Sequence, residues 1–121
     1  PDLGGTARLT RITGTGRAAD LILTARRIDG NEAKTWGVVQ RVCEPGKALH
    51  TARKMAAEIL LNAPVAVKTA LKTIRSIPDL NEHEALDADT EAGVIALTSG
   101  EPAVGIQAFL AKKAPDWSQA N

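Results

Sequence analysis

Apolar residues recur every three to four positions along most of the 121-residue chain. This spacing is typical of amphipathic helices, because it places the apolar side chains on one face. Seven segments share it and are predicted to be helical: residues 7–13, 16–23, 31–36, 47–61, 64–77, 81–98 and the stretch that begins at Pro102. The pattern therefore predicts a mostly α chain.

Residues at the segment boundaries favour the same helices. Gly14 suits the position just past a helix, and Thr15 suits the cap of the next one. Pro64 suits the first turn of a helix. Asn81 and Glu84 have the spacing of a capping box. Each predicted break thus carries a local reason to start or stop a helix.

Residues 38–43 alternate Val38, Gln40 and Val42 against their neighbours, which predicts a short strand ending at Pro45. Residues 26–30 predict a second short extended piece that ends in an Asp29-Gly30 turn. Nothing visible in the sequence pairs with the strand. We therefore expect surface left for a partner, either another part of the domain or neighbouring subunits.

The first residues place one carboxylate, Asp2, just before the Gly4-Gly5 pair and a helix. Glycine lets a backbone approach a ligand closely, Thr6 could cap the helix, and a helix N-terminus attracts negative charge. This arrangement could hold an acid at the edge of a pocket. Pro-Asp-x-Gly is equally a common turn ahead of a helix, so both interpretations stay open on spacing alone.

Composition narrows the class of protein. Net charge is +1 with both signs interspersed, and aromatic residues make up 2%, so nucleic acid and anionic membranes are not expected as main partners. No apolar run approaches the ~18 residues of a membrane span. The chain opens in a loop without Met or a signal peptide, which indicates a fragment. The single Cys43 suits a reducing compartment.

Other candidate chemistry is weak. His50 and His83 have no second ligand at metal spacing, so no metal site is expected. Cys43 lies on the predicted strand without a nearby His, which favours a small core residue over a nucleophile. Trp36 is predicted to be a packing residue. Residues 14–19 fit a dinucleotide fingerprint only in form, because helical spacing rather than a strand precedes them.

Three dispersed blocks in the same order resemble the enoyl-CoA hydratase/isomerase (crotonase) superfamily. Residues 1–14 resemble its Pro-x-x-Gly-Gly-Thr-x-Arg-Leu stretch, residues 19–42 its "LTG…I…EA…GLV" segment, and residues 105–113 its closing "GI-AF-EKR" helix. The resemblance covers nearly the whole chain but only the C-terminal half of a crotonase chain. It implies an α/β family fold, a crotonase-like β/α spiral followed by a helical trimerisation region. Residues 1–45 would end the spiral, and residues 46–121 would belong to the helical region.

The resemblance also implies chemistry on acyl-CoA thioesters, of the kind used in β-oxidation of fatty acids, through an enolate-like intermediate. The two hydratase glutamates and the oxyanion-hole N–H groups would precede this segment, so the fragment alone is expected to be inactive. Asp2 stands where hydratases have Gly and where some isomerases and dehalogenases have a catalytic Asp. It is therefore the predicted catalytic residue, with Leu3 and Gly4 as predicted substrate contacts, and it tilts the expectation toward isomerase.

The closing helix of the family carries a Phe and, three residues later, a Lys that contact the adenine end of CoA bound to a neighbouring subunit. Phe109 and Lys112 hold that spacing, which in a helix places both on one face. The alternative is a core Phe beside a surface Lys. Val104 replaces the usual acidic residue before Gly105.

The resemblance implies a homo-oligomer, trimer or hexamer, that works in the cytoplasm or the mitochondrial matrix. CoA belongs to the substrate, and no separate cofactor or membrane partner is implied. The competing interpretation is a non-catalytic helical association module. The mass of the intact polypeptide would distinguish the two.

Overall fold

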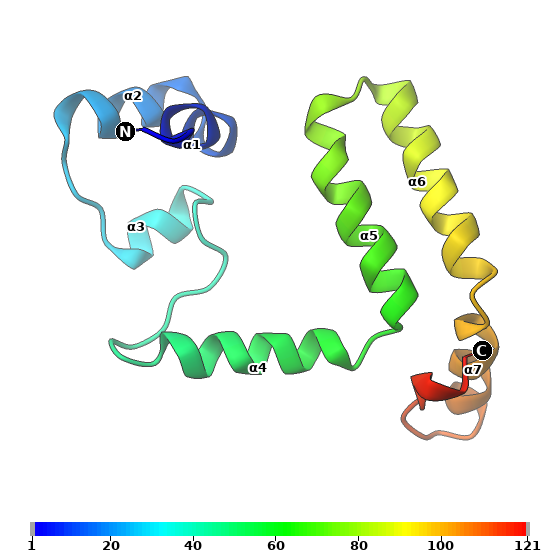
Figure 1. The fold of residues 1–121 in the computed structure, drawn as a ribbon. Coiled ribbons are helices and arrows are strands. Elements are labelled where there is room, and N and C mark those ends of the chain that lie inside the picture. Colours follow the sequence, from blue (N-terminus) through cyan, green and yellow to red (C-terminus); the bar gives the residue numbers. More distant parts are fainter. Residues whose placement is uncertain (1, 121) are drawn as a thin grey trace. The chain divides into compact units, whose positions relative to one another are not determined.

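The computed structural model describes residues 2–120 (Figure 1). The chain forms two compact units, one through Thr51 and one from Ala52 onward. In the described residues the regular elements are α1 (Gly5–Thr13), α2 (Thr15–Thr24), α3 (Gly30–Thr35), α4 (Ala48–Leu60), α5 (Pro64–Ser76), η1 (Ile77–Asp79), α6 (Glu82–Leu97), α7 (Glu101–Leu110) and η2 (Trp117–Gln119). The helical segments predicted from the spacing are confirmed.

In the first unit, α1 and α2 pack against each other and bury Ala18, which is 2% exposed. Gly14 ends α1, as predicted, and its amide donates to the carbonyl of Thr10. Its φ of 80° lies in the region that favours glycine, so the chain can turn at once into α2.

Two predicted caps in this unit are wrong. Gly4 precedes α1 and Gly14 precedes α2, and neither makes a side-chain cap bond. Thr6 and Thr15 instead lie inside the helices. Glycine is an acceptable N-cap by itself, and a sharp turn at each boundary requires a positive φ, which threonine adopts poorly.

The predicted Asp29-Gly30 turn is also wrong in detail, because Asp29 is the N-cap of α3. Its Oδ1 accepts the Glu32 amide at 2.8 Å, with Asp29 itself extended at φ −86° and ψ 178°. A short Asx side chain satisfies an unpaired N–H of the first helical turn, so the Asp-Gly pair begins a helix and does not form a separate turn.

Residues 38–43 are irregular, so the predicted strand is not observed, nor is any other strand among residues 2–120. The amides of Val38 and Val39 both point back to the carbonyl of Ala33, at 2.9 and 3.4 Å. A strand is stabilised by a neighbour that takes up its backbone hydrogen bonds. The described residues supply no such neighbour, so the alternating pattern alone does not produce a strand.

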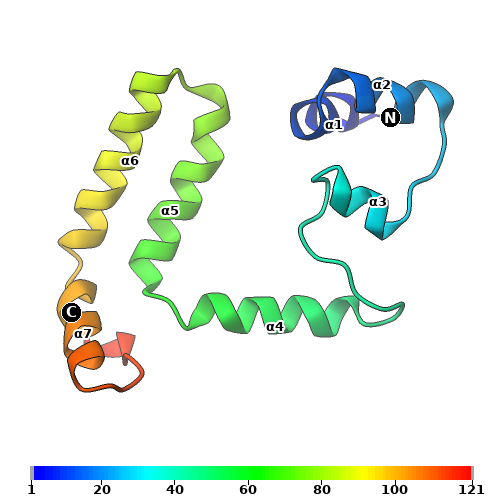
Figure 2. The ribbon, with the colours of Figure 1, turned by 180° about the vertical axis from the view of Figure 1, so that it is seen from behind.

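In the second unit, α5 and α6 run side by side in opposite directions, as both views show (Figures 1 and 2). The predicted capping box opens α6: Glu84 N donates to Asn81 Oδ1, and Asn81 N donates to Glu84 Oε2, each at 3.0 Å. Pro64 occupies the first turn of α5, as predicted. Local cap chemistry therefore fixes where both helices of the hairpin begin.

The described residues bury few side chains. Ala18 and Ala33 are the buried apolar residues, whereas long apolar side chains such as Leu60, Leu97 and Phe109 are exposed by 72–81%. In the described part of the chain no single helix has both the length and the apolarity to cross a membrane, and α6 and α7 meet that test only together, as a pair bent by 64°.

Candidate functional site

Asp2, the predicted catalytic residue, lies in a tight turn ahead of α1. Its Oδ1 accepts the Leu3 amide at 2.7 Å, and its carbonyl accepts the Gly5 amide at 3.0 Å. Leu3 and Gly4, at φ 55° and 86°, form the central pair, which is the geometry of a type I′ turn. The turn predicted from Pro-Asp-x-Gly is thus confirmed.

Leu3 is held at positive φ although it is not glycine, and its side chain is exposed, with 89% of the residue accessible. The left-handed region costs an L-residue roughly 1–2 kcal/mol. Arg8 lies across the same turn, with Nη1 3.5 Å from the Leu3 carbonyl. A Cβ built on Gly4 would meet Arg8 Cζ at 3.5 Å, so position 4 is restricted both by its φ and by this guanidinium. The turn holds Asp2 and Leu3 in a defined, exposed pose.

Phe109 and Lys112 lie at the end of α7, in the second unit. Lys112 N donates to Phe109 O at 3.1 Å and Lys113 N to Ala108 O at 3.0 Å, which together form a Schellman motif. Lys112 is its left-handed residue, at φ 52°. The prediction that Lys112 shares a helical face with Phe109 is therefore wrong, because the helix ends at Leu110. Phe109 is 81% exposed and not a core residue.

The predicted site residues fall into two separate groups. Asp2, Leu3 and Gly4 belong to the first unit, and Phe109 and Lys112 belong to the second. Leu3 and Lys112 are two of the three described non-glycine residues with positive φ, the third being Ala25. Such strained positions concentrate at functional sites.

The two histidines and the cysteine considered for other chemistry are exposed. His83 is exposed, with Nδ1 3.8 Å from Asp87, and His50 is exposed on α4. Cys43 is exposed, so the prediction of a small core residue is wrong, because the strand that would have buried it does not form. Within residues 2–120 no three His, Cys, Asp or Glu side chains could together hold a metal ion.

Trp36 packs against two arginine side chains, whose guanidinium carbons lie near its ring. Those of Arg17 and Arg26 are 5.5 and 5.0 Å from its centroid, within cation–π range. Arg26 also bonds to Glu32 and to Asp20, both at 2.7 Å. The guanidinium donates both bonds, and the bond to Glu32, followed by the bond to Asp20, holds the pKa of Arg26 well above its ordinary value. The group links the end of α2 to α3.

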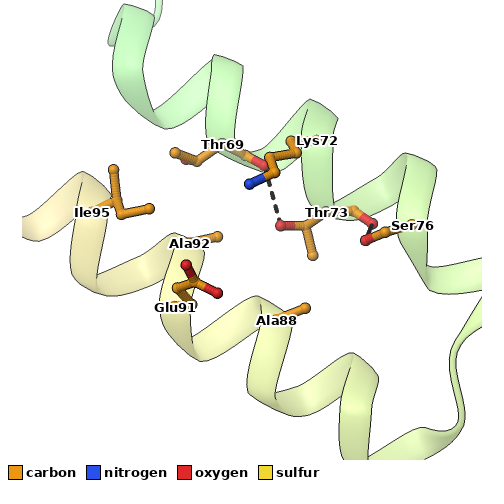
Figure 3. Close-up of a pocket in the computed structure, with 8 residues that line it drawn as sticks. All are labelled: Thr69, Lys72, Thr73, Ser76, Ala88, Glu91, Ala92 and Ile95. Carbon is orange, nitrogen blue, oxygen red and sulfur yellow. Dashed lines mark hydrogen bonds between the residues drawn. The ribbon is translucent and has the colours of Figure 1, made fainter.

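A small hollow lies between α5 and α6, lined by Thr69, Lys72, Thr73, Ser76, Ala88, Glu91, Ala92 and Ile95 (Figure 3). Thr73 Oγ1 donates to the Thr69 carbonyl at 3.1 Å, and Ser76 Oγ donates to the Thr73 carbonyl at 2.9 Å. The hollow holds about 60 Å³, which is far below the 300–1,000 Å³ typical of ligand pockets. Small residues at this helix contact explain it without a substrate.

Sequence reasoning missed Glu101 and Trp117. Glu101 is 4% exposed and bonds to two backbone amides at the start of α5. Trp117 Nε1 donates to the Leu61 carbonyl at 3.0 Å. Both contacts join segments more than 30 residues apart, and no local spacing signals such pairs.

The comparisons with known proteins agree on one family. The family model described as Enoyl-CoA hydratase/isomerase matches residues 1–120, which is nearly the whole chain. The chain is 38% identical to enoyl-CoA hydratase EchA19 of Mycobacterium tuberculosis, over 95% of this chain and 44% of the relative. It is 36% identical to the short-chain-enoyl-CoA hydratase of Clostridium acetobutylicum, over 93% and 43%.

Among solved structures, the enoyl-CoA hydratase of Bacillus anthracis matches with a TM-score of 0.90 at 35% identity, over 97% of this chain and 45% of that one. This chain thus spans less than half the length of these relatives. The expected crotonase-like fold is supported by these neighbours, with the correction that the described residues contain helices and no strand. From its matching residues and its structural neighbours, the chain belongs to the enoyl-CoA hydratase/isomerase family of the crotonase superfamily.

Proposed function

We propose that this chain forms the C-terminal half of an enoyl-CoA hydratase/isomerase that binds acyl-CoA and acts through an enolate-like intermediate. Membership of the family supports the reaction class, and relatives at 32–38% identity are named as enoyl-CoA hydratases and a carnitinyl-CoA dehydratase. The chain covers 43–46% of their lengths. The two glutamates and the oxyanion-hole N–H groups of hydratases would lie outside residues 1–121.

The observation that carries the proposal is the type I′ turn at Asp2. It fixes a carboxylate two residues ahead of a Gly-Gly pair, next to an exposed Leu3 in a strained conformation. In the proposed reaction Asp2 accepts a proton from the acyl chain and returns it at another carbon, which shifts the double bond. Asp2 is exposed to solvent within its own unit. A base that works near neutral pH would need the remainder of the site to desolvate it.

The second unit would supply the contacts to the nucleotide end of CoA. The exposed ring of Phe109 suits a purine, and the Lys112 ammonium suits a phosphate. In the proposed assembly, a homotrimer or hexamer, these residues meet CoA bound to a neighbouring subunit. The helices of residues 46–121 would form the trimerisation region.

The proposed catalytic role of Asp2 can be tested with the variant Asp2→Asn, made in the full-length protein. Asn preserves the turn, because it is equally suited to that position, but it cannot accept the proton. We expect kcat for dienoyl-CoA isomerisation to fall by roughly 10²–10⁴-fold with little change in KM. Loss of isomerisation with hydration retained would support the isomerase assignment.

The control is Asp29→Asn in the same unit. Asp29 caps α3, and Asn caps helices as well as Asp does, so both rates should stay within a small factor. Unchanged isomerisation by Asp2→Asn would return Asp2 to a turn residue.

The competing function is a non-catalytic helical association module. The exposure of long apolar side chains on α4, α5 and α7 favours it as a second candidate. A source polypeptide of roughly 250 residues, within the range of one α/β domain, would favour the enzyme. A 121-residue source polypeptide that forms complexes without turning over crotonyl-CoA would favour the module.

A further inference from the structure

Glu101 is the one charged side chain among the buried described residues, and it is 4% exposed. It begins α7, yet both of its carboxylate oxygens bond to α5. Oε1 accepts the Val65 amide at 2.6 Å, and Oε2 accepts the Ala66 amide at 3.0 Å. Bonds between a carboxylate and backbone N–H groups are among the strong ones in proteins.

The start of α5 explains why this carboxylate is needed. The N-cap is Ala63, which makes no side-chain cap bond, and alanine is among the poorest N-caps. Pro64 has no N–H, so Val65 and Ala66 carry the first unpaired donors of the helix. Glu101 accepts from both, and its negative charge lies at the positive end of the helix dipole.

Trp117 binds the chain on the α4 side of the break between α4 and α5. Its Nε1 donates to the Leu61 carbonyl, just past the end of α4, at 3.0 Å. Its ring lies against α7, where a Cβ built on Gly105 would meet Trp117 at 3.5 Å. Glu101 thus satisfies two amides at the start of α5, and Trp117 satisfies one carbonyl just past the end of α4.

We propose that Glu101 is a positioning residue that sets the pose of α7 and so presents Phe109 and Lys112 to the nucleotide end of CoA. This inference rests on the function proposed above. Phe109 lies eight residues beyond Glu101 in the same helix, roughly 12 Å along its axis. A tilt of about 10° at the Glu101 end would move Phe109 by about 2 Å. Such a shift is large compared with the tolerance of a stacking or ion-pair contact.

The test is the variant Glu101→Gln, made in the full-length protein. Kd is measured for CoA and for pantetheine, which lacks the nucleotide. The amide keeps the shape but turns one acceptor into an NH₂ group that faces a backbone N–H. Kd for CoA should rise roughly 3- to 30-fold, and Kd for pantetheine should not change. The control Glu91→Gln removes the same charge from an exposed position in the same unit and should leave both Kd values unchanged.

Phe109→Ala separates this inference from the proposed function. If it weakens CoA binding while Glu101→Gln does not, the positioning role is overturned and the nucleotide contact stands. If Phe109→Ala has no effect, the nucleotide contact itself fails, and the positioning role fails with it. An equal loss for pantetheine in Glu101→Gln would indicate general loosening and also overturn the role. Should Glu101→Gln not fold, Trp117→Phe removes the indole N–H bond and the outer ring atoms that lie against Gly105. The same selective loss of CoA affinity is expected, and unchanged Kd values would overturn the proposal.

Discussion

Replacing Lys112 by glycine should stabilise the second unit while it removes a cation from the proposed nucleotide contact. Lys112 occupies the left-handed position of a Schellman motif at φ 52°, with its amide bonded to Phe109 O at 3.1 Å. Glycine adopts this conformation without strain and keeps the backbone bond, since only the side chain is removed. Stability and ligand affinity should therefore change in opposite directions.

The magnitude follows from two opposing terms. The left-handed region costs an L-residue roughly 1–2 kcal/mol, which glycine does not incur. Glycine loses roughly 0.5–1 kcal/mol more backbone entropy on folding than alanine does. The net gain in unfolding free energy should thus be about 0.5–1 kcal/mol. Lys112→Ala is the matched control, because it removes the ammonium but keeps the Cβ and its strain, and it should stay within about 0.5 kcal/mol of the parent.

The assay is urea unfolding followed by Trp117 fluorescence in a Trp36→Phe background, because Trp36 belongs to the other unit. At a slope of roughly 2 kcal/mol/M, the Lys112→Gly midpoint should lie about 0.3–0.5 M above the parent. Both variants should lose CoA affinity alike, since both lose the charge. A Lys112→Gly midpoint no higher than that of Lys112→Ala would refute the strain argument.

Two further predictions concern pH and assembly. Hydrogen bonds from Ser118 Oγ, from the Gln119 side chain and from Ser118 N hold the pKa of Asp116 below its ordinary 3.8. They therefore stabilise η2 above pH 3.8 and are lost as pH falls through the lowered value, so Trp117 fluorescence should show an acid transition that Asp116→Asn lacks. The long apolar side chains exposed in both units should make the chain self-associate at micromolar concentration; a clean, folded monomer in sedimentation velocity would contradict this.

Features that depend on a few neighbouring residues could be predicted from the sequence. The Asn81–Glu84 capping box, Pro64 in the first turn of α5 and Gly14 at the end of α1 are all as expected. Each is decided by bonds or φ values within one turn of helix. The turn at Asp2 belongs to the same class, because Asp, Leu3 and Gly4 determine it locally.

Features that depend on distant residues could not be predicted. From the sequence, Glu101 is an acidic residue like any other in the first turn of a helix. Its hydrogen-bond partners are nevertheless the backbone amides 35 and 36 residues earlier in the chain. Lys112 fits a helical spacing, but the helix ends two residues before it and the chain turns left-handed. Periodicity gives the type of an element, whereas its ends are decided by which backbone groups find partners.

The apolar stripes carry information about contacts beyond each unit. The α5–α6 contact is lined largely by small residues, including Thr73, Ala88 and Ala92, so it leaves the long side chains of the stripes outside. Leu49, Ile74 and Ile106 remain 61–65% exposed, although the spacing predicts that they face a core. The alternating valines of residues 38–43 likewise predict a strand that finds no neighbour in the described part of the chain. Both departures have one physical cause, since a helix stripe and a strand pattern each require a second surface. They are the departures expected if residues 2–120 contribute to a core that the rest of a crotonase domain completes, and they support the proposal that this chain is one half of such a domain.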